Sequence, residues 1–219
     1  MMTTDPGRQE SHDQDGVTVI EARASDSGSL KTIVARSFHP VNPYIRACFP
    51  DTPAVSKWWF DLFEACRKDP SSHVLIALDP ATDKDIAILM LRYREGHERD
   101  AGLWTNPLYA WPADVDSDLA MPMMDSMAKY EAEFMAGKPH YLIELFGTDH
   151  RWKGKGVGTK LLQRVCEIAD AKGVEVFVQA GPSAVGFYTK MAFSIKATKT
   201  MPGGEYTETM MVRTPHAVA

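Results

Sequence analysis

A glycine-rich turn between an apolar segment and an amphipathic segment is the feature that most constrains this chain. The apolar segment 141–146 reads YLIELF and predicts a buried strand, and aliphatic residues recur at helical spacing over 161–169. Between them, Gly154, Gly156 and Gly158 occupy alternate positions. A glycine turn that opens a helix directly after a strand exposes free backbone N–H groups and the positive end of the helix dipole. The turn therefore predicts a site for a phosphate group.

Two common phosphate-binding motifs do not fit this turn. The nucleoside triphosphate motif G-x-x-x-x-G-K-[ST] is absent from the sequence. The dinucleotide motif G-x-G-x-x-G has a different spacing and belongs to the first strand–helix unit of its fold, whereas this turn lies late in the chain. A third pattern, [Q/R]-x-x-G-x-[G/A], is typical of turns that bind the pyrophosphate of acyl-CoA. It fits with Lys153 at the first position and Gly156 and Gly158 at the last two.

A second segment strengthens the acyl-CoA interpretation. Residues 174–180 predict a strand, and the segment SAVGFYTKMAF follows from Ser183 to Phe193. This order of turn, helix, strand and Y-x-x-x-A-F resembles the closing part of the GNAT superfamily of N-acetyltransferases. Within that superfamily the sequence looks most like small-molecule acetyltransferases of the puromycin-resistance type and their fungal relatives. The chain departs from the usual pattern at Lys153, Ser183 and Ala192.

The order of the predicted elements agrees with this resemblance. Periodicity and capping residues predict a strand at 17–21, helices at 27–38, 53–68 and 118–135, a strand pair at 73–78 and 86–93, and a closing hairpin of strands at 194–201 and 206–213. Residues 39–44 read as a break after the first helix. The resemblance implies an α/β (α+β) fold of the GNAT type. Its mixed, mostly antiparallel sheet has six to seven strands flanked by helices, with a V-shaped splay between the fourth and fifth strands. We expect a disordered tail at 1–15 and a single domain at 16–215.

The resemblance implies acetyl-CoA as the cofactor and assigns two stretches of backbone to it. The glycine turn would hold the pyrophosphate, where Lys153 and Lys155 add positive charge. The fourth strand would offer the N–H and C=O groups of its splayed edge to the pantetheine arm. The residues implied to bind the cofactor are Phe146, Gly147, Thr148, Lys153, Gly154, Lys155, Gly156, Val157, Gly158, Thr159, Ser183 and Tyr188.

Two residues are candidates for the chemistry. Tyr188 occupies the position where the superfamily places its general acid, and a phenol with a pKa of about 10 is protonated at neutral pH. The alternative is a core tyrosine packed on a helix. Glu144 lies in an apolar strand, where burial would raise its pKa toward that of a useful base. The alternatives for Glu144 are an ion-pair partner or a solvent-facing side chain, and His140 and Tyr141 are weaker candidates for the base. Ser183 is predicted to cap the last helix, and its family analogue contacts the CoA arm.

The acceptor is predicted to be a small molecule that carries an amine, such as a xenobiotic, an antibiotic or a secondary metabolite. The family architecture implies a pocket between the loop after the first helix, the connection 94–117 and the final hairpin. The residues implied to bind the acceptor are Phe38, Tyr44, Trp104, Glu144 and Tyr206, with His39, Asn42 and Trp111 in the same segments. The aromatic rings favour a flat or partly apolar acceptor.

Composition argues against several other classes of protein. A net charge of −5 disfavours a nucleic-acid partner. Three scattered cysteines without a C-x-x-C motif indicate neither a disulfide framework nor a metal site, and no apolar stretch is long enough to span a membrane. We therefore expect a cytoplasmic enzyme without a metal, either a monomer or a homodimer. A protein or peptide N-acetyltransferase and a non-catalytic acyl-CoA-binding protein of the same fold remain as alternatives.

Overall fold

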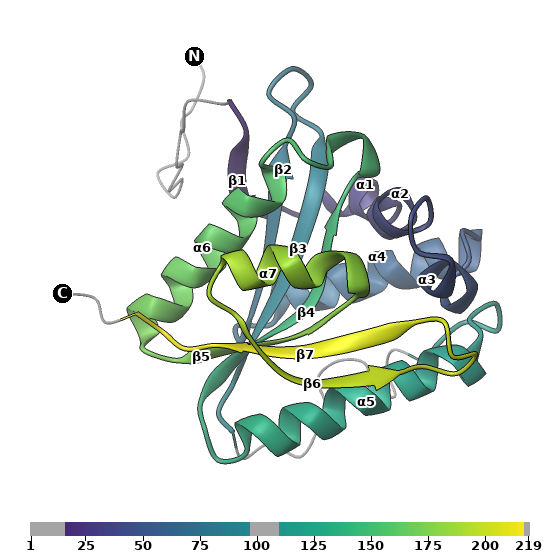
Figure 1. Ribbon diagram of the computed structural model, residues 1–219. Coiled ribbons are helices and arrows are strands. Elements are labelled where there is room, and N and C mark those ends of the chain that lie inside the picture. The colour runs from purple at the N-terminus through teal and green to yellow at the C-terminus, as the bar shows by residue number, and fades with distance from the viewer. Residues whose placement is uncertain (1–15, 97–109, 217–219) are drawn as a thin grey trace.

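The centre of the computed structural model is a seven-stranded sheet with the order β1-β2-β3-β4-β5-β7-β6 (Figure 1). The structure describes residues 16–96 and 110–216, so the predicted tail at 1–15 and the candidate residue Trp104 lie outside the described residues. The strands are β1 (Thr18–Glu21), β2 (Ser72–Leu78), β3 (Asp85–Arg94), β4 (His140–Thr148), β5 (Glu175–Ala180), β6 (Ser194–Thr200) and β7 (Thr207–Arg213). All neighbouring strands are antiparallel except β4 and β5, which are parallel. The predicted mixed, mostly antiparallel sheet is confirmed.

Helices cover both faces of the sheet and divide the core into two layers (Figure 1). The helices are α1 (Ser27–Leu30), α2 (Ile33–Phe38), α3 (Pro43–Cys48), α4 (Pro53–Lys68), α5 (Ser117–Met135), α6 (Val157–Lys172) and α7 (Val185–Lys190), with 3-10 turns η3 (His150–Trp152) and η4 (Pro182–Ala184). Residues of α1 to α5 pack on one face, and residues of α6 and α7 pack on the other. Alternation along each strand supplies both layers: Ile76 and Ile88 face α1 to α5, whereas Leu75 and Leu89 face α6.

The two long helices on the first face begin where the sequence provides caps. Thr52 Oγ1 accepts a hydrogen bond from the Val55 N–H at 3.2 Å, and a proline occupies the first turn of α4. Asp116 Oδ1 accepts hydrogen bonds from the N–H groups of Asp118 and Leu119 at 3.1 and 3.2 Å, which fixes the start of α5. The helices predicted at 53–68 and 118–135 are therefore confirmed. Within residues 16–96 and 110–216, no helix has both the length and the hydropathy to cross a membrane.

The first helical region differs from the prediction in two ways. The single helix predicted at 27–38 is two short helices, α1 and α2. The break predicted at 39–44 is also wrong, because α3 begins at Pro43. Asn42 Oδ1 accepts a hydrogen bond from the Ile45 N–H at 3.0 Å and so caps a helix whose first residue is a proline. Both residues are ordinary start signals for a helix, so α3 could have been found in the sequence.

Candidate active site

The parallel strands β4 and β5 separate partway along β4. Their pairing ends with Ile143 opposite Val178, while β4 continues to Thr148. On its other side β4 bulges against β3, and Glu144 is the extra residue between the paired positions Ile143 and Leu145. The predicted V-shaped splay between the fourth and fifth strands is confirmed. It leaves backbone groups on the last part of β4 without a strand partner on the β5 side.

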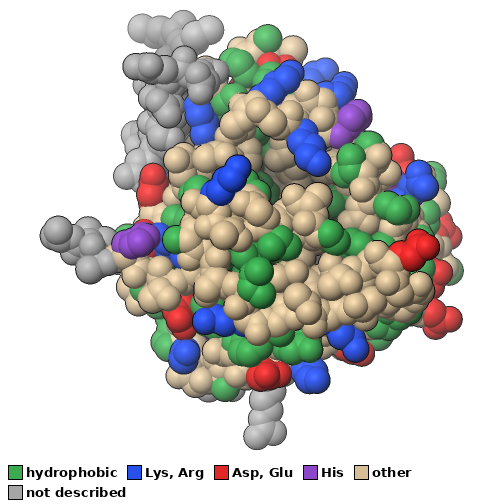
Figure 2. Space-filling model, in the orientation of Figure 1, with side chains coloured by type: hydrophobic (Ala, Val, Ile, Leu, Met, Phe, Trp, Pro, Cys, Tyr) green, Lys and Arg blue, Asp and Glu red, His purple; other side chains and the backbone are tan. Residues whose placement is uncertain are grey.

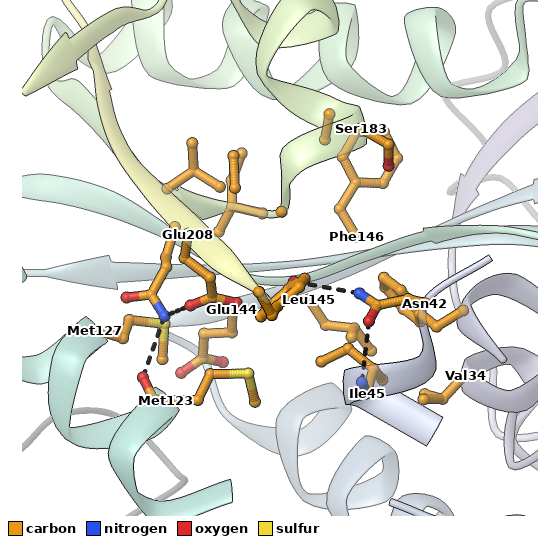
Figure 3. A pocket seen from close by; sticks show the side chains of 18 of the residues that line it. Val34, Asn42, Ile45, Met123, Met127, Glu144, Leu145, Phe146, Ser183 and Glu208 are labelled. Atoms are coloured by element: carbon orange, nitrogen blue, oxygen red, sulfur yellow. Dashed lines mark hydrogen bonds between the residues drawn. The ribbon is translucent and has the colours of Figure 1, made fainter. Parts of the chain in front are cut away.

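A cavity of about 160 Å³ lies at this splay and reaches both faces of the sheet. Figure 3 shows Ser183 on one side of the sheet, and Asn42 and the methionines of α5 on the other. The volume is about that of a cavity that holds one benzene molecule. Of the residues implied by the family resemblance, the cavity is lined by Phe38, Glu144, Phe146, Ser183, Tyr188 and Tyr206. Asn42 lines it as well.

Three further candidates for acceptor binding are not among the described residues that line this cavity. The Tyr44 ring stacks on the Tyr206 ring with 4.7 Å between centroids, and the Tyr44 hydroxyl donates to the Leu119 C=O at 2.7 Å. Tyr44 therefore supports a lining residue instead of facing the cavity. Trp111 packs edge-on against Phe49, and neither Trp111 nor His39 is among the described residues that line the cavity.

Ser183 lines the cavity but does not cap the last helix. It lies inside η4, and the residue that precedes α7 is Ala184, with no side-chain cap. The predicted capping role is therefore wrong. The geometry leaves the Ser183 side chain on the wall of the cavity, on the same face of the sheet as Tyr188.

The glycine turn forms the start of α6 and packs against the end of β4. Gly156 is the N-cap with φ of +79°, a left-handed conformation that favours glycine. The first helical hydrogen bond runs from the Lys160 N–H to the Gly156 C=O at 3.1 Å, so the three N–H groups before it have no partner within the helix. A Cβ atom at Gly158 would lie 3.5 Å from both Phe146 and Thr148, so the helix start approaches β4 closely. This arrangement fits a bound pyrophosphate.

Basic side chains surround the turn. Figure 2 shows Lys and Arg side chains gathered over the connection between β4 and α6, beside a hollow in the surface. Lys153 and Lys155 are exposed, and Lys155 Nζ lies 4.7 Å from the centre of the Trp152 ring. Arg151 Nη2 donates to Asp149 at 2.7 Å, and its hydrogen bonds hold the pKa of Asp149 well below its usual value. The ion pair between Arg151 and Asp149 therefore stabilises the turn. Lys153 and Lys155 are exposed beside the turn, where they can attract an anion.

Tyr188 lies on the cavity wall with a buried hydroxyl. The residue is 4% exposed on α7, and its ring is edge-on to Phe146 at 6.3 Å and to Phe193 at 5.1 Å. Burial raises the pKa of the Tyr188 hydroxyl well above its ordinary value. The phenol is consequently protonated throughout the neutral range and can donate a proton to a strongly basic group.

Glu144 also lies on the cavity wall, but its carboxylate is paired with Arg92 of β3. Arg92 Nε donates to Glu144 Oε1 at 2.7 Å, and Nη2 donates to Oε2 at 3.2 Å. Arg92 also donates to Asp69 at 2.5 Å. Protonation of Glu144 would break a buried bidentate pair and leave the guanidinium with one carboxylate. The geometry favours the ion-pair alternative over the role of a base.

Glu208 of β7 is the cavity residue that the sequence analysis missed. It is 4% exposed, lines the cavity, and burial raises its pKa to about 8. Gln179 Nε2 donates to Glu208 Oε2 and, at 3.1 Å, to the Met123 C=O. Glu208 also hydrogen-bonds with Tyr206, whose hydroxyl accepts from Asn42 Nδ2 at 3.2 Å. Glu208 is therefore a buried carboxyl group in a chain of uncharged partners.

A family model and many solved structures match this chain. The model described as the acetyltransferase (GNAT) family matches residues 119–193, about a third of the chain, and no curated protein sequence matches. A structure of a histone acetyltransferase and related acetyltransferase from Corynebacterium glutamicum has a TM-score of 0.60 at 17% identity, covering 93% of this chain and 99% of the other.

Two insect structures are also similar in fold. A putative arylalkylamine N-acetyltransferase of the mosquito Aedes aegypti has a TM-score of 0.66 at 14% identity, covering 90% of this chain and 87% of the other. A polyamine N-acetyltransferase of Drosophila melanogaster has a TM-score of 0.65 at 13% identity, covering 90% and 99%. Each of these alignments covers 90% of this chain and so extends well beyond residues 119–193, which the family model matches.

Proposed function

We propose that this chain, which belongs to the GNAT superfamily of N-acetyltransferases, transfers an acetyl group from acetyl-CoA directly to the amine of a small molecule, with both bound at once. The observation that carries the proposal is the cavity at the splay of β4 and β5, which reaches both faces of the sheet. A thioester can enter from the side of Tyr188 and the glycine turn. An acceptor can enter from the side of Phe38 and Tyr206.

The chain offers acetyl-CoA two sites made of backbone. The N–H groups at the start of α6, from Gly156 to Thr159, would hold the pyrophosphate, with Lys153 and Lys155 beside them. The N–H and C=O groups of β4 between Phe146 and Thr148 would bond the pantetheine arm, because β5 no longer pairs with this part of the strand. When bound, acetyl-CoA supplies an activated acetyl thioester. One N–H of the same edge would stabilise the oxyanion that develops on the carbonyl.

Tyr188 is the proposed general acid. It lies on the cavity wall on the α7 side of the sheet, and its buried hydroxyl holds its proton at neutral pH. A thiolate that leaves the acetyl carbon needs a proton, and a phenol at hydrogen-bond distance can provide it. The packing of the ring against Phe146 and Phe193 fixes its position before the substrates bind.

A small acceptor agrees better with the cavity than a polypeptide does. Similar folds belong to enzymes named for arylalkylamines and polyamines, and also to enzymes named for ribosomal protein and histone substrates. The acceptor side of this cavity is bounded by α2, α3, α5 and β7, and it is only part of a total volume of about 160 Å³. That space suits a single ring or a short chain that carries an amine. The alternatives remain a protein N-acetyltransferase and a non-catalytic acyl-CoA-binding protein.

Gly156→Glu tests the cofactor site. The new carboxylate would stand at the positive helix start and repel the pyrophosphate, so acetyl-CoA should no longer raise the melting temperature. Gly173→Glu is the matched control, because Gly173 is also left-handed, with φ of +70°, but lies at the far end of the same helix. Both variants should lose about 1–2 kcal/mol of stability from backbone strain. Undiminished binding of acetyl-CoA to the Gly156 variant would refute the assignment of the turn.

Tyr188→Phe tests the acid. We expect turnover to fall by about 10²-fold or more, with acetyl-CoA binding little changed, because the ring remains and only the proton donor is removed. Tyr93→Phe serves as the control, since Tyr93 lies on β3 and is not among the described residues that line the cavity. Steady-state kinetics and calorimetric binding of CoA separate the two effects. Equal turnover of the wild type and the Tyr188 variant would remove Tyr188 from the mechanism.

A further inference from the structure

The acceptor side of the cavity contains a buried carboxyl group for which the described residues show no cationic partner. Glu208 is 4% exposed, and its hydrogen-bond partners are the uncharged side chains of Gln179 and Tyr206. The other carboxylate on the wall, Glu144, is paired with Arg92. The described residues that line the cavity include no lysine, arginine or histidine. A carboxylate in such a place is costly unless a cation joins it, so the site is built to receive a positive charge from outside the chain.

A second acceptor atom stands beside this carboxyl group. Gln179 Nε2 donates hydrogen bonds to Glu208 and to the Met123 C=O. Its Oε1 is buried without a hydrogen-bond partner among the described residues. Gln179 Oε1 is therefore an acceptor without a partner, and it lies beside the Glu208 carboxyl group, whose partners are uncharged. Figure 3 shows Glu208 on the side of Met123 and Met127, across the cavity from Asn42 and Ile45. A primary ammonium carries three N–H donors and satisfies both acceptors at once.

Apart from Asn42 and Tyr206, the rest of the described lining on the acceptor side is apolar. The described lining on this side consists largely of aliphatic, methionine and aromatic side chains: Val34, Phe38, Ile45, Phe49, Met123 and Met127. Because Glu208 is the one carboxyl group on the described lining without a cationic partner, a second positive charge on the acceptor would be buried without compensation. These features select an acceptor with one ammonium group on an apolar or aromatic body.

We propose that Glu208 binds the ammonium of a monoamine acceptor with an apolar body and takes a proton from its nitrogen before the acetyl group is transferred. This inference rests on the proposed function. In the step, the amine nitrogen forms a bond to the acetyl carbon and the carbon–sulfur bond of the thioester breaks. Before the attack, the Glu208 carboxylate takes one proton from the ammonium, which leaves a neutral amine. After the attack, the thiolate takes the Tyr188 proton and the second proton lost by nitrogen returns to the Tyr188 oxygen, so charge and atoms balance.

The neighbours of Glu208 whose pKa is shifted by burial have values raised away from the neutral range. Burial raises the pKa of Tyr44 and of Cys48 on α3 to about 12, and also raises the pKa of Tyr188 and Tyr206. Glu144 of β4 is held by its ion pair. Glu208 itself has a pKa of about 8 in the empty site, so acetylation should rise with pH through this value as the carboxylate forms.

The test compares the wild type with Glu208→Gln and Glu208→Asp, using 2-phenylethylamine, the uncharged 2-phenylethanol and the polyamine spermidine as probes. We expect 2-phenylethylamine to have a kcat/KM at least 10-fold above that of spermidine. Glu208→Gln should lower kcat/KM for the amine by about 10²-fold or more and remove the inflection near pH 8. Glu208→Asp should restore part of the rate and keep an inflection, whereas loss of a merely structural contact would impair both variants alike. Glu133→Gln, an exposed position on α5, is the control.

Direct binding separates this inference from the proposed function. Calorimetry with and without CoA should show that the wild type binds 2-phenylethylamine at least 10-fold more tightly than 2-phenylethanol, and that Glu208→Gln abolishes the difference. If the wild type does not bind acetyl-CoA but still binds 2-phenylethylamine more tightly than 2-phenylethanol, the transferase proposal fails and the ammonium site stands. If acetyl transfer occurs and Glu208→Gln has the wild-type rate and pH profile, the transferase stands and the Glu208 assignment is overturned. Equal binding of the amine and the alcohol by the wild type also overturns it.

Discussion

Replacement of Glu208 by glutamine should make the folded protein more stable at alkaline pH. Burial raises the pKa of Glu208 from an ordinary value of 4.5 to about 8. Between these two values the folded protein keeps a proton that the unfolded chain has already released. Stability therefore falls as pH rises through this window, by about 1.4 kcal/mol per pH unit and about 5 kcal/mol at most. The contribution is intact below pH 4.5 and fully lost above about pH 8.

Glutamine keeps the shape of the protonated acid but cannot ionise. The difference in unfolding free energy between Glu208→Gln and the wild type should therefore grow with pH, from about 1 kcal/mol at pH 5 to about 4 kcal/mol at pH 8. For a chain of this size that corresponds to a difference in melting temperature of about 10 °C at pH 8. Other groups that titrate in the same range cancel, because both proteins contain them.

Urea unfolding at pH 5, 6, 7, 8 and 9, without ligand, measures this difference directly. Glu133→Gln should follow the wild type at every pH, because that carboxylate is exposed on α5. A constant offset between Glu208→Gln and the wild type across the series would mean that Glu208 ionises in the folded protein as it does in the unfolded chain. The burial argument, and with it the reason to expect an uncompensated carboxyl group in the cavity, would then be refuted.

Two further substitutions probe the walls of the cavity. A Cβ atom at Gly181 would lie 2.8 Å from the Tyr206 hydroxyl, so Gly181→Ala should displace that ring and raise KM for the amine several-fold, measured by steady-state kinetics. Gly186→Ala is the control, because a Cβ atom there has no neighbour within 4 Å, and it should leave KM unchanged. An equal rise of KM in both variants would contradict the displacement of the Tyr206 ring. Glu144→Gln should cost about 3–5 kcal/mol in chemical unfolding by leaving Arg92 without its bidentate partner. Loss of turnover without this loss of stability would return Glu144 to the role of a base.

Most of the fold could be predicted because its signals are local. The glycine turn, the apolar strand before it and the amphipathic helix after it occur in one continuous segment, and the structure has all three in that order. The splay of β4 and β5 followed from the family resemblance and not from residues, because a bulge at Glu144 depends on the partner strand. Ala192 has a φ of +65°, a left-handed conformation that explains why the family pattern usually has glycine at this position. The sequence pattern alone showed only that alanine replaces the glycine.

The candidate site was predicted less completely, because burial of a polar residue depends on distant packing. Glu208 lies near the polar start of β7. It shares one face of the strand with Met210 and Val212, which lie in the core. This spacing of two residues was a usable signal for a buried carboxyl group. No local pattern identifies Arg92 as the partner of Glu144, since the two residues are brought together by the pairing of β3 and β4.

The two cavity carboxyl groups show how packing separates chemically identical residues into different roles. Glu144 contacts a guanidinium and forms a buried ion pair, whereas Glu208 contacts uncharged groups and its pKa is raised by burial to about 8. Glu208 and Tyr188 are both positioned by the end of β5, since β7 pairs with this strand and α7 follows it after η4. The proposed proton transfers, from nitrogen to Glu208 and from Tyr188 to sulfur, would thus occur on opposite faces of the sheet within one cavity. The splay through which we propose that the thioester enters also separates the proposed base from the proposed acid, so a change in the length of the β5–α7 connection should alter both proton transfers together.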